Sequence, residues 1–233
     1  MELNKRNARV SGILYLIIAI AAGFHYGYLQ TSVFVAGNPV ETLQNVQNMP
    51  GIFRLGILAG LTGFFCDIAV SVYFYYFLRG VNRGLSLTAM SFRLVQSTIL
   101  SVNLFSLLII MLITSPESSI FALDDNQLPS MVYLMLSLHD LGFDIAILFF
   151  AVHCFIAAYL FYKSEHFPET IGILFLLAGI SYLIDSSATF IWPAATGITE
   201  IFVAITATAA ELFVVFWLIF AGIRNPPKQA FAR

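Results

Sequence analysis

Long runs of apolar residues separated by short polar segments make up this chain from end to end. Six of these runs reach the length of about 20 residues that an α-helix needs to cross the hydrocarbon core of a bilayer. They lie at about residues 10–30, 53–78, 85–113, 131–162, 170–192 and 198–223. The pattern therefore predicts an all-α fold, a six-helix transmembrane bundle that takes up residues 1–233 as a single domain.

Two segments differ from a plain crossing helix. Residues 131–162 would extend about 48 Å at about 1.5 Å per residue, so this helix must tilt or project beyond the bilayer. Residues 37–52 are polar and contain the turn signals Asn-Pro and Pro-Gly. Apolar residues recur there at every third position, which permits a short helix lying on the membrane surface; they are Val40, Leu43, Val46 and Met49.

Composition agrees with a membrane protein, and the basic residues predict its orientation. Hydrophobic residues make up 59% of the chain and charged residues 10%, whereas soluble domains carry about 25% charged residues. With the N-terminus inside the cell, nine of the eleven Lys and Arg residues fall in inner segments; they are Lys5, Arg6, Arg9, Arg79, Arg83, Lys163, Arg224, Lys228 and Arg233. Because inner loops carry the excess of positive charge, we expect both termini in the cytoplasm and the chain in the plasma membrane, the inner membrane of a bacterium. No basic run or nucleic-acid motif is present, so the expected partner is the lipid bilayer and not a nucleic acid.

Ionisable and amide side chains interrupt the apolar runs, and they are the candidate functional residues. A charged side chain at the centre of a membrane helix is costly, so such residues usually face the interior of a bundle and often mark function. The predicted polar intramembrane core consists of Asp67, Arg93, Gln96, His139, Asp144, His153, Asp185 and Glu211.

Helical spacing places these residues on the small or polar faces of their helices. One stripe in the second run holds Gly56, Gly60, Gly63, Asp67 and Ser71, and small residues at this spacing let neighbouring helices approach closely. Similar faces hold Arg93, Gln96 and Asn103 in the third run, and His139, Gly142, Ala146 and His153 in the fourth, where Asp140 and Asp144 lie on an adjacent face. In the fifth and sixth runs they hold Ala178, Ser181, Tyr182, Asp185 and Thr189, and then Ala204, Ala207, Thr208 and Glu211. We expect all these faces to meet in the middle of the bundle.

The charges within the runs do not balance, since one arginine faces five acids. We therefore expect some of the acids to be protonated, or a cation or a water-filled cavity to be present. Two interpretations remain open. Arg93 could form a structural ion pair with one or two of three acids, Asp67, Asp144 and Glu211, or the same residues could form a site for transport, ligand binding or catalysis.

Metal binding and other enzyme chemistry have little support in the sequence. His139 and His153 cannot bind one ion, because fourteen helical positions separate them by about 21 Å. His139 with His25 and Asp185 is geometrically compatible at the outer level, but no H-E-x-x-H or paired C-x-x-C motif is present. No nucleophile elbow or phosphate-binding loop occurs, and no Lys lies within a run. We expect no metal and no cofactor.

Aromatic residues make up 15% of the chain, and we expect most of them to be lipid-facing packing. The cluster at residues 72–77, Val-Tyr-Phe-Tyr-Tyr-Phe, is interpreted in the same way.

Several short motifs spread over nearly the whole chain are fairly specific as a set. They include Gly12-Ile-Leu-Tyr-Leu, Phe53-Arg-Leu-Gly, Cys66-Asp67, Phe92-Arg93-Leu-Val-Gln96, Phe149-Phe-x-x-His153-Cys154 and Tyr182-Leu-Ile-Asp185-Ser, together with Asn103, His139, Gly142, Asp144, Glu211 and Trp217. With them the chain resembles a bacterial family of integral membrane proteins known as domain of unknown function 4386. The resemblance implies a membrane fold and no chemistry, and makes Asp67, Arg93, Asp144, Asp185 and Glu211 the preferred polar set. His25 and Asp140 depart from the family pattern.

Three functions follow as hypotheses. The first is a membrane protein that binds or moves a small solute or a proton through its polar core, with Asp67, Asp144 and Glu211 as cation- or proton-binding carboxylates and Arg93 as counter-ion. The second is an intramembrane enzyme that uses His139 and the acids. The third is a structural or partner-binding subunit whose ion pairs only hold the bundle together. Six helices are few for a monomeric transporter, so a transport role would favour a homo-oligomer.

Overall fold

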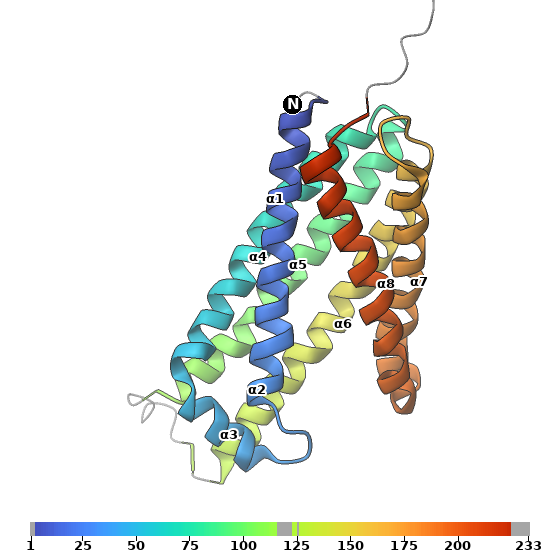
Figure 1. Ribbon diagram of the computed structural model, residues 1–233. Helices are drawn as coiled ribbons and strands as arrows, with labels where there is room; N and C mark the ends of the chain where they lie inside the picture. The colour runs from blue at the N-terminus through green and yellow to red at the C-terminus, as the bar shows by residue number, and fades with distance from the viewer. Residues whose placement is uncertain (1–2, 116–122, 125, 225–233) are drawn as a thin grey trace, which may run out of the picture.

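A computed structural model describes residues 3–115, 123–124 and 126–224 of the chain. The described residues form helices and connecting turns and contain no strand, and six helical stretches are long and apolar enough to cross a membrane (Figure 1). The predicted all-α fold with six membrane-spanning helices is therefore confirmed. The chain is a multi-pass membrane protein.

The first and last spans are each assembled from more than one helical piece. The first runs from Lys5 to Val33 as α1 (Lys5–Ala22), a π-helical stretch η1 (Gly23–Gln30) and the short α2 (Thr31–Val33). The four spans in the middle are α4 (Pro50–Leu78), α5 (Arg83–Ile113), α6 (Gln127–Tyr162) and α7 (Glu169–Ile191). The last is η3 (Pro193–Ala195), α8 (Thr196–Phe216) and the π-helical η4 (Trp217–Ala221).

Helix starts follow the local sequence. Asn82 caps α5, because its side chain accepts a hydrogen bond from the backbone N–H of Leu85 at 2.9 Å. Asn38 caps the short helix α3 (Pro39–Asn48) in the same way, and Pro39 occupies its first turn. The short helix predicted in the first polar connection is thus present. It does not simply lie on a surface, since it packs against α6 and buries Thr42 and Val46.

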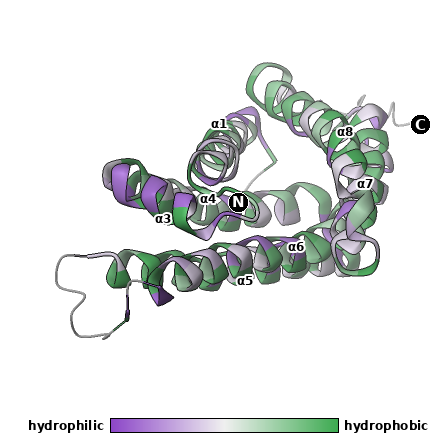
Figure 2. Ribbon diagram, turned by 90° about the horizontal axis from the view of Figure 1, so that it is seen from below, coloured by the Kyte–Doolittle hydropathy of each residue, from purple (hydrophilic) through white to green (hydrophobic). Residues whose placement is uncertain are grey.

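The spans form a closed arrangement in which each packs against the next. Contacts run from α1 to α4, α5, α6, α7 and α8 in turn, and the last span returns to α1 through α8 and η4. Seen along the bundle, α1 stands beside α4 and between α4 and α8, while α5 and α6 form a long row opposite it (Figure 2). The start of α1 and the end of η4 lie at the same end of the bundle (Figure 1).

Glycines allow the closest helix contacts. A Cβ atom on Gly60 of α4 would lie 3.1 Å from the ring of His25, and one on Gly63 would lie 3.2 Å from the Cβ of Ala21. The small-residue stripe of α4 therefore faces the first span. On α7, a Cβ on Gly172 would lie 2.6 Å from the backbone oxygen of Ala158, so α6 and α7 approach backbone to backbone at that point.

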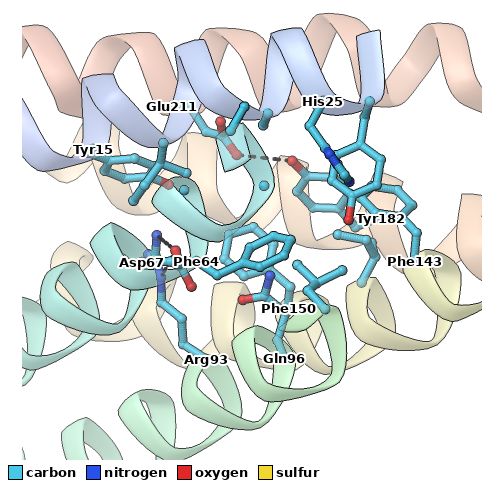
Figure 3. A pocket seen from close by; sticks show the side chains of 18 residues that line it. Tyr15, His25, Phe64, Asp67, Arg93, Gln96, Phe143, Phe150, Tyr182 and Glu211 are labelled. Carbon is cyan, nitrogen blue, oxygen red and sulfur yellow. Dashed lines mark hydrogen bonds and ion pairs between the residues drawn. The ribbon is translucent and has the colours of Figure 1, made fainter. Parts of the chain in front are cut away.

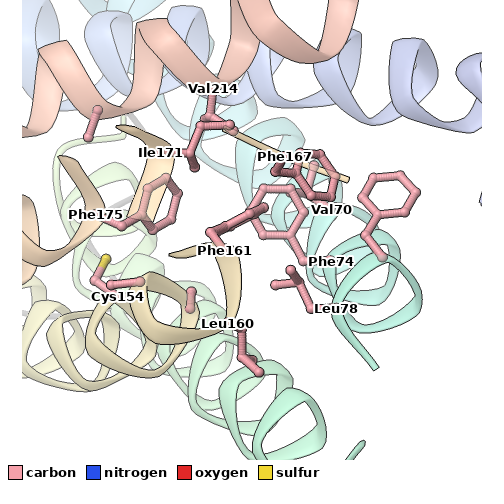
Figure 4. Packing of buried hydrophobic residues seen from close by; sticks show 14 of the residues in the cluster. Val70, Phe74, Leu78, Cys154, Leu160, Phe161, Phe167, Ile171, Phe175 and Val214 are labelled. Carbon is pink, nitrogen blue, oxygen red and sulfur yellow. The ribbon is translucent and has the colours of Figure 1, made fainter. Parts of the chain in front are cut away.

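An aromatic cluster fills the end of the bundle where the chain begins. Phe74 and Phe77 of α4 pack there with Phe161 and Phe175 from α6 and α7 (Figure 4). Phe74 and Phe77 belong to the segment 72–77 that we expected to face lipid, and both are buried. The expectation was wrong for them because one face of α4 points at α6 and α7, whereas Tyr73, Tyr75 and Tyr76 on its other faces are partly exposed.

The small and polar face that was predicted for the sixth span is only partly correct. Ala207 is buried as expected, but Ala204 and Thr208 are exposed. Helix α8 lies at the margin of the bundle and contacts only α7 and the first span along most of its length, so a narrow strip is buried. That strip continues through Ala210 and Val214.

Candidate functional site

Arg93 and Asp67 form the one ion pair among the described residues, and it is buried between α4 and α5. The Nε and Nη2 atoms of Arg93 donate to Oδ1 of Asp67 at 2.8 and 2.5 Å. Ser97, one helical turn after Arg93, donates its hydroxyl to Oδ2 of Asp67 at 2.5 Å. Arg93 is 0% exposed and Asp67 5% exposed, so each charge is compensated by the other and not by water.

Arg93 is held from other directions as well. Nδ1 of His153 lies 2.8 Å from the backbone oxygen of Ala89, so this nitrogen donates and Nε2 of a neutral ring can accept from Nη1 of Arg93 at 3.4 Å. The guanidinium carbon also lies over three aromatic rings, at 4.9 Å from Tyr15, 5.4 Å from Phe74 and 5.3 Å from Phe150. The sequence left three acids open as partners of Arg93, and the structure gives it Asp67.

A cavity of about 210 Å³ lies next to this pair in the middle of the bundle (Figure 3). Every one of the six spans contributes to its wall. Besides Arg93 and Asp67, the polar and aromatic side chains that line it are Tyr15, His25, Tyr26, Phe64, Gln96, Phe143, Phe150, Tyr182 and Glu211. The polar faces of the spans thus surround a space and do not simply pack together.

Glu211 of α8 is the second carboxylate of the cavity wall, and it has far fewer partners than Asp67. Tyr182 of α7 donates its hydroxyl to Oε1 of Glu211 at 3.1 Å, which is the only hydrogen bond of Glu211 within the described part of the chain (Figure 3). No basic side chain of that part lies within 4.0 Å of it. At longer range Arg93 attracts a negative charge on Glu211 and Asp67 repels it.

Three further polar groups of the wall have no hydrogen-bond partner among the described residues. They are the hydroxyls of Tyr15 and Tyr26 and the side-chain carbonyl oxygen of Gln96. Tyr15 is 1% and Gln96 7% exposed. A buried polar group without a partner costs about 1–3 kcal/mol, so three such groups around one cavity are typical of a site that another molecule completes.

His25 and His139 meet directly at the far end of the cavity from Arg93, with their Nε2 atoms 3.1 Å apart. Nδ1 of His25 lies 2.7 Å from the backbone oxygen of Gly56 and must therefore carry a proton. Nδ1 of His139 lies 3.3 Å from the backbone oxygen of Asn103 and 3.4 Å from the hydroxyl of Ser106, whose own proton goes to that backbone oxygen at 2.5 Å. The contacts therefore fix a proton on Nδ1 of His25 and are compatible with more than one protonation of His139.

The π-helical stretch η1 helps to bring His25 and Tyr26 into the same wall. A π-helical turn holds more residues than an α-helical one, so consecutive side chains project at a smaller angle. The ring of Tyr26 stacks on His139 at 5.8 Å between centroids and packs at a tilt against Phe143 at 4.3 Å. The first span therefore contributes two adjacent residues to the cavity, where a regular helix would more readily contribute one.

Three of the acids named from the sequence, Asp140, Asp144 and Asp185, do not line the cavity. Asp144 lies near Thr189 of α7, and Asp185 accepts a hydrogen bond from Thr199 of α8 at 2.5 Å. Asp140 accepts one from Gln30 at 2.6 Å. Of the three acids named from the sequence as possible partners of Arg93, Asp67 and Glu211 share the cavity, whereas Asp144 faces α7.

The structure also does not bring the three residues considered for a metal site, His25, His139 and Asp185, together. His25 and His139 are in contact, but Asp185 does not join them, and no group of three His, Cys, Asp or Glu side chains in the described residues could hold a metal ion. His153 lies with Arg93, well away from His139.

Sequence reasoning missed the aromatic half of the cavity wall. Tyr15 was not singled out, although Ser11, Tyr15, Ile18, Ala22 and His25 follow one helical stripe at spacings of three and four residues. Phe64 lies on the stripe of Gly60 and Asp67, and Phe143 and Phe150 lie on the stripe of His139 and His153. They were passed over because an aromatic residue in an apolar run is equally compatible with lipid, core or cavity.

The polar cavity lies within the part of the chain that matches other proteins. A protein family described as a domain of unknown function (DUF4386) matches residues 10–222. The chain belongs to this family. The match extends over all the cavity residues, and it confirms the resemblance that the motifs indicated.

A second comparison gives one relative and no activity. An uncharacterized protein from Archaeoglobus fulgidus is 25% identical over 178 residues, which cover 76% of this chain and 85% of that protein. No solved structure matches the chain. Membership of DUF4386 gives a family and a membrane fold, and the function has to be argued from the cavity.

Proposed function

We propose that this protein binds a small solute inside the membrane, in the central cavity, and that the bound solute is moved across the bilayer. The observation that carries the proposal is the cavity of about 210 Å³, walled by all six spans, into which incompletely paired polar groups converge. Leaving such groups buried without partners lowers stability, so their persistence is explained if a bound molecule pairs with them. Transporters commonly bind their substrates between helices near the middle of the bilayer, as this cavity would do.

The structure offers less to the two other hypotheses. An enzyme needs a nucleophile, an acid–base pair or a metal beside the space for its substrate. His139 lies beside the cavity, but both of its ring nitrogens are within contact of His25, Asn103 or Ser106. A purely structural role accounts for the paired Arg93 and Asp67 and leaves the cavity unexplained.

The orientation of the chain is part of the proposal. The end of the bundle that holds the start of α1 also holds the turn between α4 and α5, with Arg79 and Arg83, and the end of α6, with Lys163 (Figure 1). At the opposite end, the described residues include one basic side chain, that of Arg54 near the start of α4. Because positive residues are retained on the cytoplasmic side, we assign the first of these ends to the cytoplasm of a plasma membrane. Two of the basic residues counted from the sequence, Lys228 and Arg233, lie outside the described residues.

Filling the cavity tests the proposal. Ala59 of α4 lines the cavity, so Ala59→Leu should occupy part of it, whereas Ala204→Leu makes the same change at an exposed position of α8. Native mass spectrometry of gently purified protein should show a small molecule bound to the wild type and to Ala204→Leu, with its occupancy reduced at least about tenfold in Ala59→Leu.

The same experiment can contradict the proposal. Equal occupancy in both leucine variants would place the bound molecule elsewhere. A wild-type protein that binds nothing, and whose thermal unfolding is not shifted by any small cation, anion or neutral solute offered to it, would leave the cavity without a ligand and remove the basis of the proposal.

A further inference from the structure

The charges around the cavity are unevenly compensated, and this difference bears on the kind of solute. Arg93 has its counter-charge in Asp67, in direct contact. Among the described residues, Glu211 has only the hydroxyl of Tyr182 as a partner. When Glu211 is ionised, the cavity wall holds one positive and two negative side chains, and because one pair is matched, one negative charge is left to be compensated from within. A cation in the cavity would provide that compensation.

The rest of the wall suits an organic cation better than a bare metal ion. A hard metal ion requires several oxygen ligands, with carboxylates foremost, and no group of three His, Cys, Asp or Glu side chains that could hold a metal ion occurs in the described part of the chain. The wall instead presents aromatic rings, those of Tyr15, Tyr26, Phe64, Phe143 and Phe150. The faces of such rings attract ammonium groups, and the attraction is larger where water is excluded. Arg93 already occupies ring faces of Tyr15 and Phe150, so the rings left for a solute cation are those of Tyr26, Phe64 and Phe143.

Polar groups without partners point to an ammonium that still carries N–H donors. The side-chain oxygen of Gln96 is buried and lacks a donor, and the hydroxyl of Tyr15 can accept as well as donate. Oε2 of Glu211 has no hydrogen bond from the described residues. A primary or secondary ammonium group can supply donors of this kind, whereas an anion cannot.

The volume limits the size of the solute. An apolar cavity of about 150 Å³ holds a benzene molecule. About 210 Å³ therefore accommodates one aromatic ring, or a compact aliphatic body of similar size, together with a short arm that ends in the ammonium group.

We propose that the solute of the central cavity is a small organic ammonium ion, with its charge against the carboxylate of Glu211 and its apolar body against the aromatic wall. This inference rests on the proposed function, since it names the class of solute that the same cavity takes. Tyr182 acts as a positioning residue in it, because its hydroxyl holds one oxygen of Glu211 and leaves the other toward the solute.

Two probes that differ mainly in charge test the proposal on the full-length protein in detergent micelles. Benzylammonium carries the ring and the charged arm, and benzyl alcohol has nearly the same size and shape without the charge. Isothermal titration calorimetry at pH 7 should show benzylammonium binding to the wild type at least about tenfold more tightly than benzyl alcohol.

The substituted proteins locate the charge preference. Glu211→Gln should reduce the preference for benzylammonium to less than about twofold while the fold, followed by thermal unfolding, is retained. Glu200→Gln is the matched control, because Glu200 is an exposed acid on the same helix. Its removal should leave the preference for benzylammonium unchanged.

The outcomes separate this inference from the proposed function. Equal binding of both probes to the wild type, with loss of both in Ala59→Leu, would overturn the ammonium class and keep the cavity as a solute site. Retention of the charge preference in Glu211→Gln would overturn the role of Glu211. Binding of neither probe to the wild type, with a different co-purified solute in the cavity, would also overturn the ammonium class for this site.

Discussion

Two carboxylates line the same cavity, and their surroundings differ sharply. Asp67 is paired with Arg93 through two hydrogen bonds and with Ser97 through a third, in a region that three aromatic rings close off. Within the described residues Glu211 has a single hydrogen bond, from Tyr182. The comparison teaches that an intramembrane acid is not a functional residue merely because it is charged. Asp67 is accounted for by the structure around it, whereas Glu211 is the acid that we propose to face the solute.

The largest loss of stability should come from breaking the ion pair between Arg93 and Asp67. Arg93→Met keeps an apolar side chain of some length but leaves Asp67 buried without its counter-charge, so the free energy of unfolding should fall by about 3–5 kcal/mol. Adding Asp67→Asn to Arg93→Met should restore part of the loss, because it removes the unpaired charge. Reversible unfolding in mixed micelles measures both changes.

A second double variant makes this test specific for one acid. Glu211→Gln added to Arg93→Met should restore much less stability than Asp67→Asn does, since Glu211 is not in contact with Arg93. Equal restoration by the two changes would mean that Arg93 is shared between both acids and that the contrast between them is wrong.

A smaller loss of stability is expected when the Arg93–Asp67 pair keeps both charges and Asp67 loses one hydrogen bond. Ser97→Ala removes the donor to Oδ2 of Asp67, and hydrogen bonds to charged groups contribute about 1.5–3 kcal/mol. Ser101→Ala, one turn further along α5, removes only a hydroxyl that donates to the backbone oxygen of Ser97, and it should cost less than about 1 kcal/mol. Chemical denaturation compares the two variants, and similar losses would argue against a special role for the Ser97 contact.

The smallest loss of stability should come from changes around Glu211. Tyr182→Phe removes the one hydrogen bond of Glu211 and should lower the free energy of unfolding by about 0.5–1.5 kcal/mol. It should weaken benzylammonium binding more than it weakens benzyl alcohol binding, because the carboxylate is no longer held in place. Tyr159→Phe, at an exposed tyrosine of α6, is the control and should change neither quantity. Loss of binding for both probes alike would point to a change in cavity shape instead.

Much of the fold could be predicted from the sequence, because bilayer length and apolar runs determine it almost directly. The six spans and the helix in the first connection follow from such patterns. Their ends differ by a few residues, as where the first span begins at Lys5 and not at Val10. These shifts arise because capping residues and flanking polar residues extend the helices past the apolar runs.

The partners within the core were harder to predict. Helical spacing gives the direction of a side chain around its own axis and says nothing of which neighbour lies there. Asp144 illustrates the limit, since five residues after His139 it points about 140° away from it and reaches α7 and not the cavity. His25 was not in the preferred polar set, yet it contacts His139 from a π-helical stretch that the sequence did not predict.

The most direct test of the account compares Asp67→Asn with Glu211→Gln in one experiment, the free energy of unfolding of the ligand-free protein in mixed micelles. Both changes replace a carboxylate by an amide of the same shape in the wall of the same cavity. The account predicts a loss of about 3–5 kcal/mol for Asp67→Asn, which leaves Arg93 without its counter-charge, and a change of less than about 1 kcal/mol for Glu211→Gln. Losses of equal size would contradict it, because Glu211 would then be a structural group like Asp67 and its charge would not be available to a solute.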